Sequence, residues 1–418
     1  MTSFFLETKE QLISYFQKGE KASKDFKIGT EFEQFLFEET TNKRVPYEGK
    51  TGIKSILEEF TEFGWTPVFE KQYLIGLKHL KASQTISLEP GGQIELSGSP
   101  LLNLHDVKHE IDSYQQQLDS ILTSKNIRKV ALGFDPITKR DDVPLMPKGR
   151  YKIMQHYMPK KGNHGLDMML QTCIVQVNLD YATEKDMVKK FRVAMGLQPI
   201  LSALFANSFL VEGKDSGYKS YRNFIWQNTD PDRCGLLPFV FDKNMGYERY
   251  VDYLLDVPMY FVYRQGYLNT AGQSFRDFLA KKLPGVPGES PTPQDWIDQM
   301  SVAFPEVRLK RFLELRAADC GEGPFVMALP ALWVGLLYDL KNLDYCHELV
   351  QSFSYADILD VYNHVPKQGL ATQIQGNSIQ KLAQELVEKS KEGLIRRQQF
   401  SSTVQDESLY LNVLLNLF

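Results

Sequence analysis

Apolar residues recur along the chain with two different periods, which separate the expected helices from the expected strands. Spacings of three and four residues predict helices over residues 8–18, 52–63, 104–122, 185–207, 331–339 and 378–398. Alternation of apolar and polar residues predicts strands over residues 26–37, 85–97, 170–181 and 307–319. Because helices and strands interleave irregularly, the pattern indicates an α+β fold and not a regular βαβ series.

Two of the predicted strands carry glutamates on one face. Glu31 and Glu33 share the polar face of the first strand, and Glu89 and Glu95 share that of the second, on either side of a predicted bend at Pro90-Gly91-Gly92. A half-solvated antiparallel sheet would show a similar pattern in any single strand. No lysine lies between the paired glutamates, however, and like charges in one cleft raise each other's pKa unless cations neutralise them. Together the four carboxylates favour a cation site.

The other two predicted strands place mixed polar side chains on one face. The third carries Gln176 and Asn178, and the fourth carries Lys310, Glu314 and Arg316 opposite a row of leucines. Oxygen ligands favour a hard ion such as Mg²⁺, which commonly bridges carboxylates to substrate phosphates. We therefore expect ATP-dependent phosphoryl chemistry on a sheet platform. The chain contains neither GxxxxGK[ST] nor GxGxxG, so neither a P-loop nor a Rossmann nucleotide site is supported.

Composition narrows the class of protein. Of the 418 residues, 43% are hydrophobic and 24% are charged, which is the balance of a globular chain and not of a disordered one. A formal net charge of −4 argues against a nucleic-acid or anionic-membrane partner. No stretch approaches the roughly 20 apolar residues of a membrane span. Four cysteines without a CxxC pair, and a start that includes Glu7 and Glu10, lead us to expect a reduced, cytoplasmic protein.

Ten short motifs follow one another from about residue 26 to about residue 397. They are GTEFE at 29–33, ISLEPGGQIELSG at 86–98, MPKGRY at 146–151, GLDMM at 165–169, VQVNLD at 175–180, LQPI at 197–200, TDPDR at 229–233, DVPMYF at 256–261, FPEVRLK at 304–310 and ALPALWVGLLY at 328–338. In this order they resemble the plant and proteobacterial type of glutamate–cysteine ligase. That family belongs to the carboxylate–amine ligase superfamily, which is related to glutamine synthetase.

The resemblance implies one catalytic domain over residues 1–418, with a helical lead-in over about 1–25 and a helical C-terminal segment over about 340–418. Its fold would be a curved, mainly antiparallel β-sheet that forms an active-site funnel surrounded by α-helices. The implied reaction joins L-glutamate to L-cysteine with ATP through γ-glutamyl phosphate, giving γ-glutamylcysteine, ADP and phosphate. This is the first step of glutathione biosynthesis. The implied partners are these small molecules, with the protein as a monomer or homodimer.

The resemblance also assigns roles to single residues. The ligands of Mg²⁺, or of Mn²⁺, would be Glu31, Glu33, Glu89, Glu95 and Glu314. The catalytic residues would be Glu31, Glu33, Glu95, Glu314 and Arg316. ATP would be contacted by Arg316 and Lys310. Guanidinium groups suit bidentate binding of carboxylates, and the substrate pocket would include Arg150, Gln176, Arg222, Trp226 and Tyr260.

Four departures from the family pattern bear on these expectations. Phe32 replaces a usual His, but its parity points away from the glutamate pair. Ile174 replaces a Thr and would put an apolar group beside the pocket. Residues 320–327 replace a stretch that normally reads GGPWRR, which removes two cations and could weaken nucleotide or acceptor binding. Thr270 and Gly285 stand where the plant enzymes have their redox cysteines, so we do not expect activation through that disulfide.

Three functions remain in view. The leading one is an active glutamate–cysteine ligase. The second is a γ-glutamyl ligase with a different amine acceptor, motivated by Ile174 and the altered segment 320–327. The third is an inactive homologue that binds glutamate or a nucleotide, which the presence of all five carboxylates disfavours.

Overall fold

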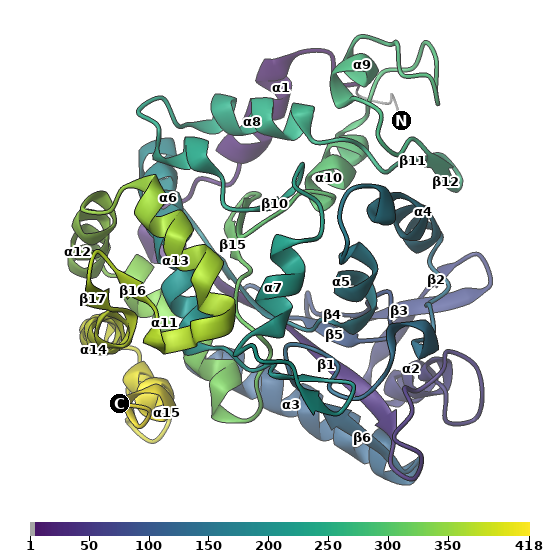
Figure 1. Ribbon diagram of the computed structural model, residues 1–418. Helices are drawn as coiled ribbons and strands as arrows, with labels where there is room; N and C mark the ends of the chain where they lie inside the picture. Colours follow the sequence, from purple (N-terminus) through teal and green to yellow (C-terminus); the bar gives the residue numbers. More distant parts are fainter. Residues whose placement is uncertain (1–4) are drawn as a thin grey trace.

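In residues 5–418, which the computed structural model describes, a nine-stranded antiparallel β-sheet forms the centre of the molecule (Figure 1). Its strands are β1 (Ile28–Glu38), β2 (Trp65–Glu70), β3 (Tyr73–His79), β4 (Thr85–Leu88), β5 (Ile94–Ser97), β6 (Ile127–Val130), β7 (Val175–Leu179), β14 (Val307–Leu309) and β15 (Leu313–Leu315). They lie in the order β14-β15-β7-β1-β5-β4-β3-β2, and β6 pairs with the end of β1. The α+β prediction is confirmed.

Helices surround this sheet, and small two-stranded sheets lie at its periphery (Figure 1). The helices are α1 (Lys9–Gln17), α2 (Ile53–Phe60), α3 (Leu104–Ser124), α4 (Gly149–Tyr157), α5 (Gly165–Gln171), α6 (Glu184–Leu204), α7 (Tyr221–Gln227), α8 (Tyr247–Asp256), α9 (Phe275–Leu279), α10 (Pro293–Ser301), α11 (Pro324–Leu337), α12 (Leu340–Gln351), α13 (Tyr355–Gln368), α14 (Ile379–Arg397) and α15 (Asn412–Leu415). The small sheets pair β8 (Leu210–Val211) with β9 (Lys214–Asp215), β10 (Cys234–Gly235) with β13 (Phe304–Pro305), β11 (Phe261–Tyr263) with β12 (Tyr267–Asn269), and β16 (Gln373–Ile374) with β17 (Asn377–Ser378).

Strand β1 organises the sheet because it pairs with β5, β6 and β7. Its side chains alternate between two faces. Ile28, Thr30 and Phe32 lie on the face that packs against α3 and α11, and all three are buried. Glu31 and Glu33 therefore point to the opposite face, toward a cavity that α4, α5 and α7 border. Burial of Phe32 at 3% exposure confirms that it belongs to the core face and not to the glutamate face.

Most of the predicted helices are confirmed, with ends shifted by a few residues. Local capping explains where some of them start, since the Asn103 side chain accepts the N–H of Asp106 at the start of α3. The helix predicted over 331–339 is longer, because α11 begins at Pro324 and includes Pro330. Nearly every side chain of α11 is buried. A helix that is apolar on all sides has no amphipathic period to mark its beginning.

Two predicted strands differ from the structure. Residues 307–319 do not form one strand, because the chain turns back between β14 and β15 and the Lys310 N–H donates to the Phe312 carbonyl at 2.8 Å. Residues at the start of 170–181 belong to α5, so β7 begins only at Val175. By contrast, the bend predicted at Pro90-Gly91-Gly92 is confirmed as the turn between β4 and β5.

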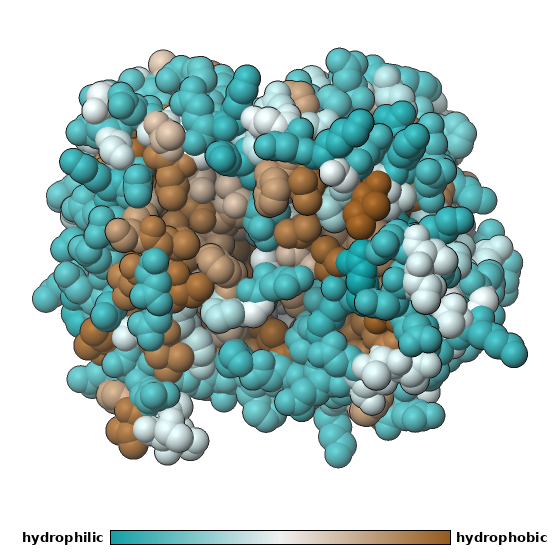
Figure 2. Space-filling view, turned by 60° about the horizontal axis from the view of Figure 1, so that its bottom comes forward, coloured by the Kyte–Doolittle hydropathy of each residue, from teal (hydrophilic) through white to brown (hydrophobic). Residues whose placement is uncertain are grey.

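One face of the molecule combines hydrophilic regions with an apolar hollow (Figure 2). Figure 2 shows brown, hydrophobic side chains gathered in a depression on the face seen there, within a mostly hydrophilic surface. Within residues 5–418 no single helix has both the length and the apolar composition of a membrane span, although α11 and α12, which meet at 88°, pass the same test as a pair.

Candidate active site

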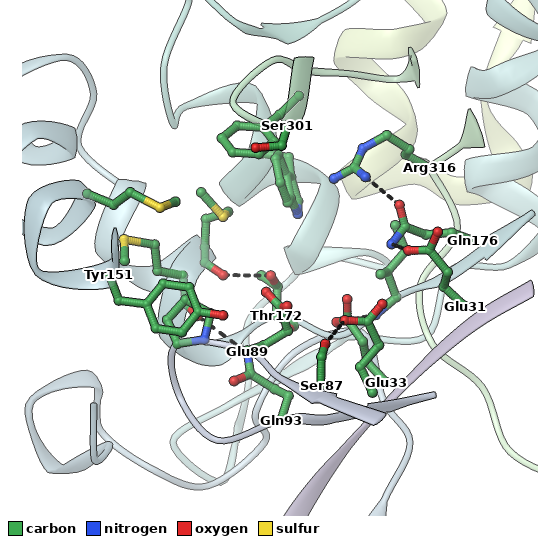
Figure 3. Close-up of a pocket in the computed structure, with 18 of the residues that line it drawn as sticks. Glu31, Glu33, Ser87, Glu89, Gln93, Tyr151, Thr172, Gln176, Ser301 and Arg316 are labelled. Atoms are coloured by element: carbon green, nitrogen blue, oxygen red, sulfur yellow. Dashed lines mark hydrogen bonds between the residues drawn. The ribbon is translucent and has the colours of Figure 1, made fainter. Parts of the chain in front are cut away.

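The register of the central strands brings the predicted carboxylates together. Glu33 of β1 lies directly opposite Glu95 of β5, and Glu31 lies opposite Gln176 of β7. Gln176 donates from Nε2 to Glu31 at 2.9 Å, and Ser87 donates from its hydroxyl to Glu95 at 2.8 Å. Figure 3 shows Glu31, Glu33 and Gln176 pointing into a common space above the sheet. Glu31 and Glu33 thus lie together with Glu95, which is far from them in sequence, on one face of the sheet. We call this surface the acidic floor of the site.

The turn between β4 and β5 adds Glu89 to this floor. Gly92 has φ of +80°, a left-handed conformation that favours glycine. Gly91 lies so close to α5 that a Cβ there would be 2.2 Å from the Leu170 carbonyl oxygen. The two glycines therefore allow the turn to fold tightly beneath α5, and Glu89 and Gln93 both line the space above the sheet.

A cavity of about 270 Å³ lies between this floor and α4, α5 and α7. Nine of the twelve predicted site residues line it, namely Glu31, Glu33, Glu89, Glu95, Arg150, Gln176, Arg222, Trp226 and Arg316. Arginines and glutamates therefore line one cavity together. Figure 3 shows Arg316, Gln176 and Glu31 on one side of it and Tyr151 on the other.

Burial and mutual repulsion perturb the carboxylates of the floor. Burial, with the charges of Glu314 and Glu95, raises the pKa of Glu31 to about 7. Burial and the nearby Glu89 and Glu95 raise the pKa of Glu33 well above its ordinary value. The pKa of Glu95 is raised by burial and by Glu89, against hydrogen bonds from two serine hydroxyls. A bound cation would lower these pKa values by neutralising the clustered charge.

Glu314 behaves differently, because three cations surround it. Its carboxylate accepts from Arg308 Nε at 2.5 Å, from Lys310 Nζ at 2.7 Å and from Arg316 Nη1 at 3.1 Å. Burial alone would raise the pKa of Glu314, but these three cations hold it well below its ordinary value. The side chain is completely buried and does not line the cavity. Glu314 therefore acts on the cavity only by holding Arg308 and Arg316, whose side chains line it.

Two further predicted residues lie outside the lining of the cavity. Lys310 follows β14 and its Nζ is held by Glu314. Tyr260 is completely buried, with its ring 4.0 Å from the guanidinium carbon of Arg233 and 5.3 Å from the ring of Tyr157. The structure therefore places Tyr260 in a packed aromatic cluster beside the site.

Sequence reasoning missed several residues that line the cavity. Arg308 lies within FPEVRLK, and Lys148 and Tyr151 flank Arg150 within MPKGRY. Lys148 donates to the Leu88 carbonyl at 2.7 Å, and burial lowers its pKa. The two motifs were the available signal, because each already contained one predicted residue. Met154, Met168 and Met169 also line the cavity, and nothing in the sequence distinguishes them from core methionines.

Comparisons with known proteins show the family of the chain. A family model described as glutamate–cysteine ligase family 2 (GCS2) matches residues 27–417. The chain belongs to this family. Chloroplastic glutamate–cysteine ligase B of Oryza sativa subsp. japonica is 48% identical over 392 residues, covering 93% of this chain and 78% of that enzyme. The chloroplastic glutamate–cysteine ligase of Arabidopsis thaliana is also 48% identical, covering 93% of this chain and 74% of that enzyme.

A solved structure supports the fold independently of sequence. A glutamate–cysteine ligase from Francisella tularensis in complex with AMP matches with a TM-score of 0.54, covering 94% of this chain and 81% of that chain. At 12% identity this likeness concerns the fold alone. It agrees with the glutamine-synthetase-like architecture that the sequence motifs implied.

One prediction from the sequence needs correction. The relatives of the ligase family just described are chloroplastic enzymes, which points to a plastid and contradicts the cytoplasmic localisation that we expected. That prediction was wrong because cysteine count and the composition of the first residues report only weakly on the compartment.

The departures from the ligase family pattern fall on different sides of the sheet. Ile174 lines the cavity, and its N–H donates to Glu33 at 3.1 Å. Residues 320–327 do not line the cavity. They border two apolar cavities, of about 180 and 860 Å³, that also include Val175 and Phe32 from the opposite face of the sheet. The expectation that this segment changes nucleotide or acceptor binding directly is therefore not supported by its position.

The donor set of the cavity fits the metal ion that the ligase family implies. Four carboxylates and the Gln176 amide oxygen are hard ligands suited to Mg²⁺ or Mn²⁺. Burial, together with repulsion from neighbouring glutamates, raises the pKa values of Glu31, Glu33 and Glu95, and a bound cation would oppose both effects. Among residues 5–418, however, no three His, Cys, Asp or Glu side chains already stand at metal-binding distances from one centre. Binding would require rotations of these side chains.

Proposed function

We propose that this ligase joins the γ-carboxylate of L-glutamate to the amine of L-cysteine through γ-glutamyl phosphate, with conversion of ATP to ADP and phosphate. The observation that carries the proposal is the cavity lined by four glutamates together with four arginines: Arg150, Arg222, Arg308 and Arg316. Such a cavity suits anionic substrates together with the cations that neutralise them. ATP and amino acids supply the required phosphate and carboxylate groups.

The arginines divide into two groups with different supports. Arg308 and Arg316 are both held by Glu314, so their guanidinium groups are oriented before a ligand arrives. We assign them to the phosphates of ATP, with Lys310 supporting them through the same carboxylate. Arg222 and Arg150 project from α7 and α4, and we assign them to the carboxylates of the amino-acid substrates. Preoriented donors need little reorganisation when charge develops during phosphoryl transfer.

We propose Glu31, Glu33, Glu89 and Glu95 as the residues that hold Mg²⁺. When bound, the ion would neutralise the transferring phosphoryl group. Glu314 would join this set only by exchanging one of its arginine partners for the ion, since both of its oxygens already accept hydrogen bonds from cations.

We further propose that residues 1–418 act as one catalytic domain, as a monomer or homodimer. The family match from 27 to 417 supports a single unit. The lead-in helix α1 packs against α8, and α14 of the C-terminal segment packs against α11. Residues 1–4 of the predicted lead-in lie outside the described part of the chain.

The reaction can be tested with purified protein, Mg²⁺, ATP and glutamate, by measuring phosphate release while the amine acceptor is varied. We expect release to be fastest with cysteine and to coincide with formation of γ-glutamylcysteine. A clear preference for another amine would reject cysteine as the acceptor. No turnover with any acceptor would instead favour an inactive binding protein.

A different acceptor remains the second candidate because Ile174 lines the cavity where the family has Thr. The exchange removes a hydroxyl from the site, so an acceptor with a less polar side chain would be favoured. The variant Ile174→Thr should therefore leave the rate with cysteine equal or higher and lower the rate with apolar amines. Unchanged ratios between acceptors would exclude a role for Ile174 in acceptor choice.

The raised pKa values predict how stability depends on pH and metal. A carboxyl whose folded pKa lies above its unfolded value of 4.5 stabilises the folded state while it is protonated. The stabilisation from Glu31 is complete below about pH 4.5 and is lost as pH rises through about 7. We expect the metal-free melting temperature to fall more across this interval in wild type than in Glu31→Gln, and Mg²⁺ to restore it above pH 7. Parallel curves in EDTA for the two proteins would contradict the prediction.

A further inference from the structure

Helix α7 carries two side chains of the cavity, Arg222 and Trp226. They are four residues apart and so lie on the same side of the helix. The guanidinium carbon of Arg222 lies 5.6 Å from the centroid of the Trp226 ring. Any shift of α7 would therefore move both side chains relative to a substrate.

A buried carboxylate outside the cavity lies next to the start of α7. The side chain of Asp319 is completely buried, and one oxygen accepts the N–H of Asn207 and the hydroxyl of Ser208, each at 2.7 Å. Its other oxygen accepts the hydroxyl of Ser220 at 2.8 Å and lies 3.9 Å from Nη1 of Arg222. Both oxygens of Asp319 are thus committed to the region around α7.

The two serines connect Asp319 to the backbone of α7. The N–H of Arg222 donates to the Ser208 hydroxyl oxygen at 3.1 Å, and the N–H of Asn223 donates to that of Ser220 at 3.1 Å. Ser220 is the N-cap of the helix. Each hydroxyl accepts from the first turn and donates to the same carboxylate, so Asp319 holds that turn through two parallel links.

Asp319 also compensates the charge of Arg222. The Arg222 side chain is 3% exposed. Burial lowers its pKa, and Asp319 is the foremost of the carboxylates that oppose this effect. The guanidinium donates to the carbonyls of Ala317 at 3.1 Å and Arg316 at 3.0 Å. In the part of the chain that the structure describes, its buried Nε has no hydrogen-bond partner.

We propose that Asp319 is a positioning residue for glutamate binding, which holds the first turn of α7 through Ser208 and Ser220 so that Arg222 and Trp226 face the cavity. Asp319 does not touch this cavity and borders the smaller cavity of about 180 Å³ on the other side. It therefore acts on substrate only through α7. The inference rests on the proposed function, in which Arg222 binds a carboxylate of an amino-acid substrate, and it assigns Arg222 to glutamate among these substrates.

The test is a double-substitution cycle on the full chain. Asp319→Asn keeps the size of the side chain and removes its charge, so KM for glutamate should rise about tenfold or more. KM for ATP and kcat should stay within roughly twofold, because Arg308 and Arg316 keep their own support from Glu314. In an Arg222→Gln background the same substitution should raise KM for glutamate by no more than roughly twofold, since the guanidinium is gone and only the position of Trp226 can still change.

A matched control is Asp135→Asn. Asp135 is equally buried and pairs with Arg44 at 2.9 Å, but it does not line the cavity. The variant Asp135→Asn should lower the melting temperature of the protein without changing KM for glutamate. Ser208→Ala removes one of the two links and provides a second test, with a smaller rise in the same constant, should Asp319→Asn fold poorly.

The outcomes separate this inference from the proposed function. A lower melting temperature in Asp319→Asn with unchanged KM for glutamate would overturn the positioning role. Effects of Asp319→Asn and Arg222→Gln that multiply in the double variant would overturn it as well. If Arg222→Gln alone leaves KM for glutamate unchanged, Arg222 does not bind glutamate. The proposed function is then contradicted at this residue, and the positioning role of Asp319, which depends on it, is contradicted too.

Discussion

The variant Glu95→Gln is expected to lower kcat by roughly 10³-fold or more while the protein remains folded. Glu95 lies opposite Glu33 and is held by the hydroxyls of Ser87 and Ser97 at 2.8 and 3.0 Å. Gln keeps the shape, can accept from one serine hydroxyl and donate to the other, but cannot supply a negative charge to a cation. The loss should appear in ADP formation at saturating substrates and in the affinity for Mg²⁺ measured by calorimetry.

Removal of this charge should not destabilise the fold. Burial and Glu89 raise the pKa of Glu95, so a neutral side chain relieves repulsion in the metal-free protein. A matched control is Glu110→Gln, which neutralises another buried glutamate, one that accepts from Ser99 and Gln84 away from the cavity. This control should keep near-normal turnover. Near-normal turnover of Glu95→Gln would contradict the assignment of Glu95 to the metal site.

The variant Arg316→Gln is expected to lower kcat/KM for ATP by roughly 10²- to 10³-fold. Arg316 donates to Gln176 and, at 3.1 Å, to Glu314, and it lines the cavity. Without it, Glu314 keeps only Arg308 and Lys310, and the cavity loses an oriented cation. The effect should fall on ATP more than on glutamate, so the two KM values should be measured separately.

The matched control for this variant is Arg311→Gln. Arg311 belongs to the turn between β14 and β15, and its guanidinium carbon lies 4.7 Å from the ring centroid of Tyr15, away from the cavity. It should leave both KM values unchanged. Equal losses for ATP and glutamate in Arg316→Gln would contradict the assignment of Arg316 to the phosphates and would point to general damage of the cavity.

The spacing of apolar and polar residues along each segment accounts for the parts of the fold that the sequence predicted. Alternation along β1 separated Phe32 from Glu31 and Glu33 correctly, because side-chain direction in a strand depends only on parity. The same reasoning failed for 307–319. A two-residue period continues formally through a tight hairpin, so the turn at Lys310 was not visible in the pattern. The helix predicted over 331–339 starts too late, because the uniform hydrophobicity of α11 leaves no amphipathic period that would mark its beginning.

The residues that make up the candidate site were also largely predictable, but the ion pairs and hydrogen bonds between them were not. The motifs and the single-residue matches to the family identified the glutamates and most of the arginines that line the cavity. They could not show that Glu314 is enclosed by three cations, because two of these come from the partner strand and the turn of a hairpin that the pattern did not reveal. Nor could they show that Asp319 reaches the start of α7, a contact between residues about one hundred positions apart.

The sequence by itself determined the family, the α+β class and the residue types that converge on the site, because motifs and periodicity are local properties of the chain. Only the tertiary structure decided which carboxylates share a cavity and which are neutralised. Strand register sets Glu33 against Glu95, and hairpin geometry sets Glu314 against Arg308. Charge, burial and distance act through space, so a pKa or a hydrogen bond depends on neighbours that sequence order does not specify.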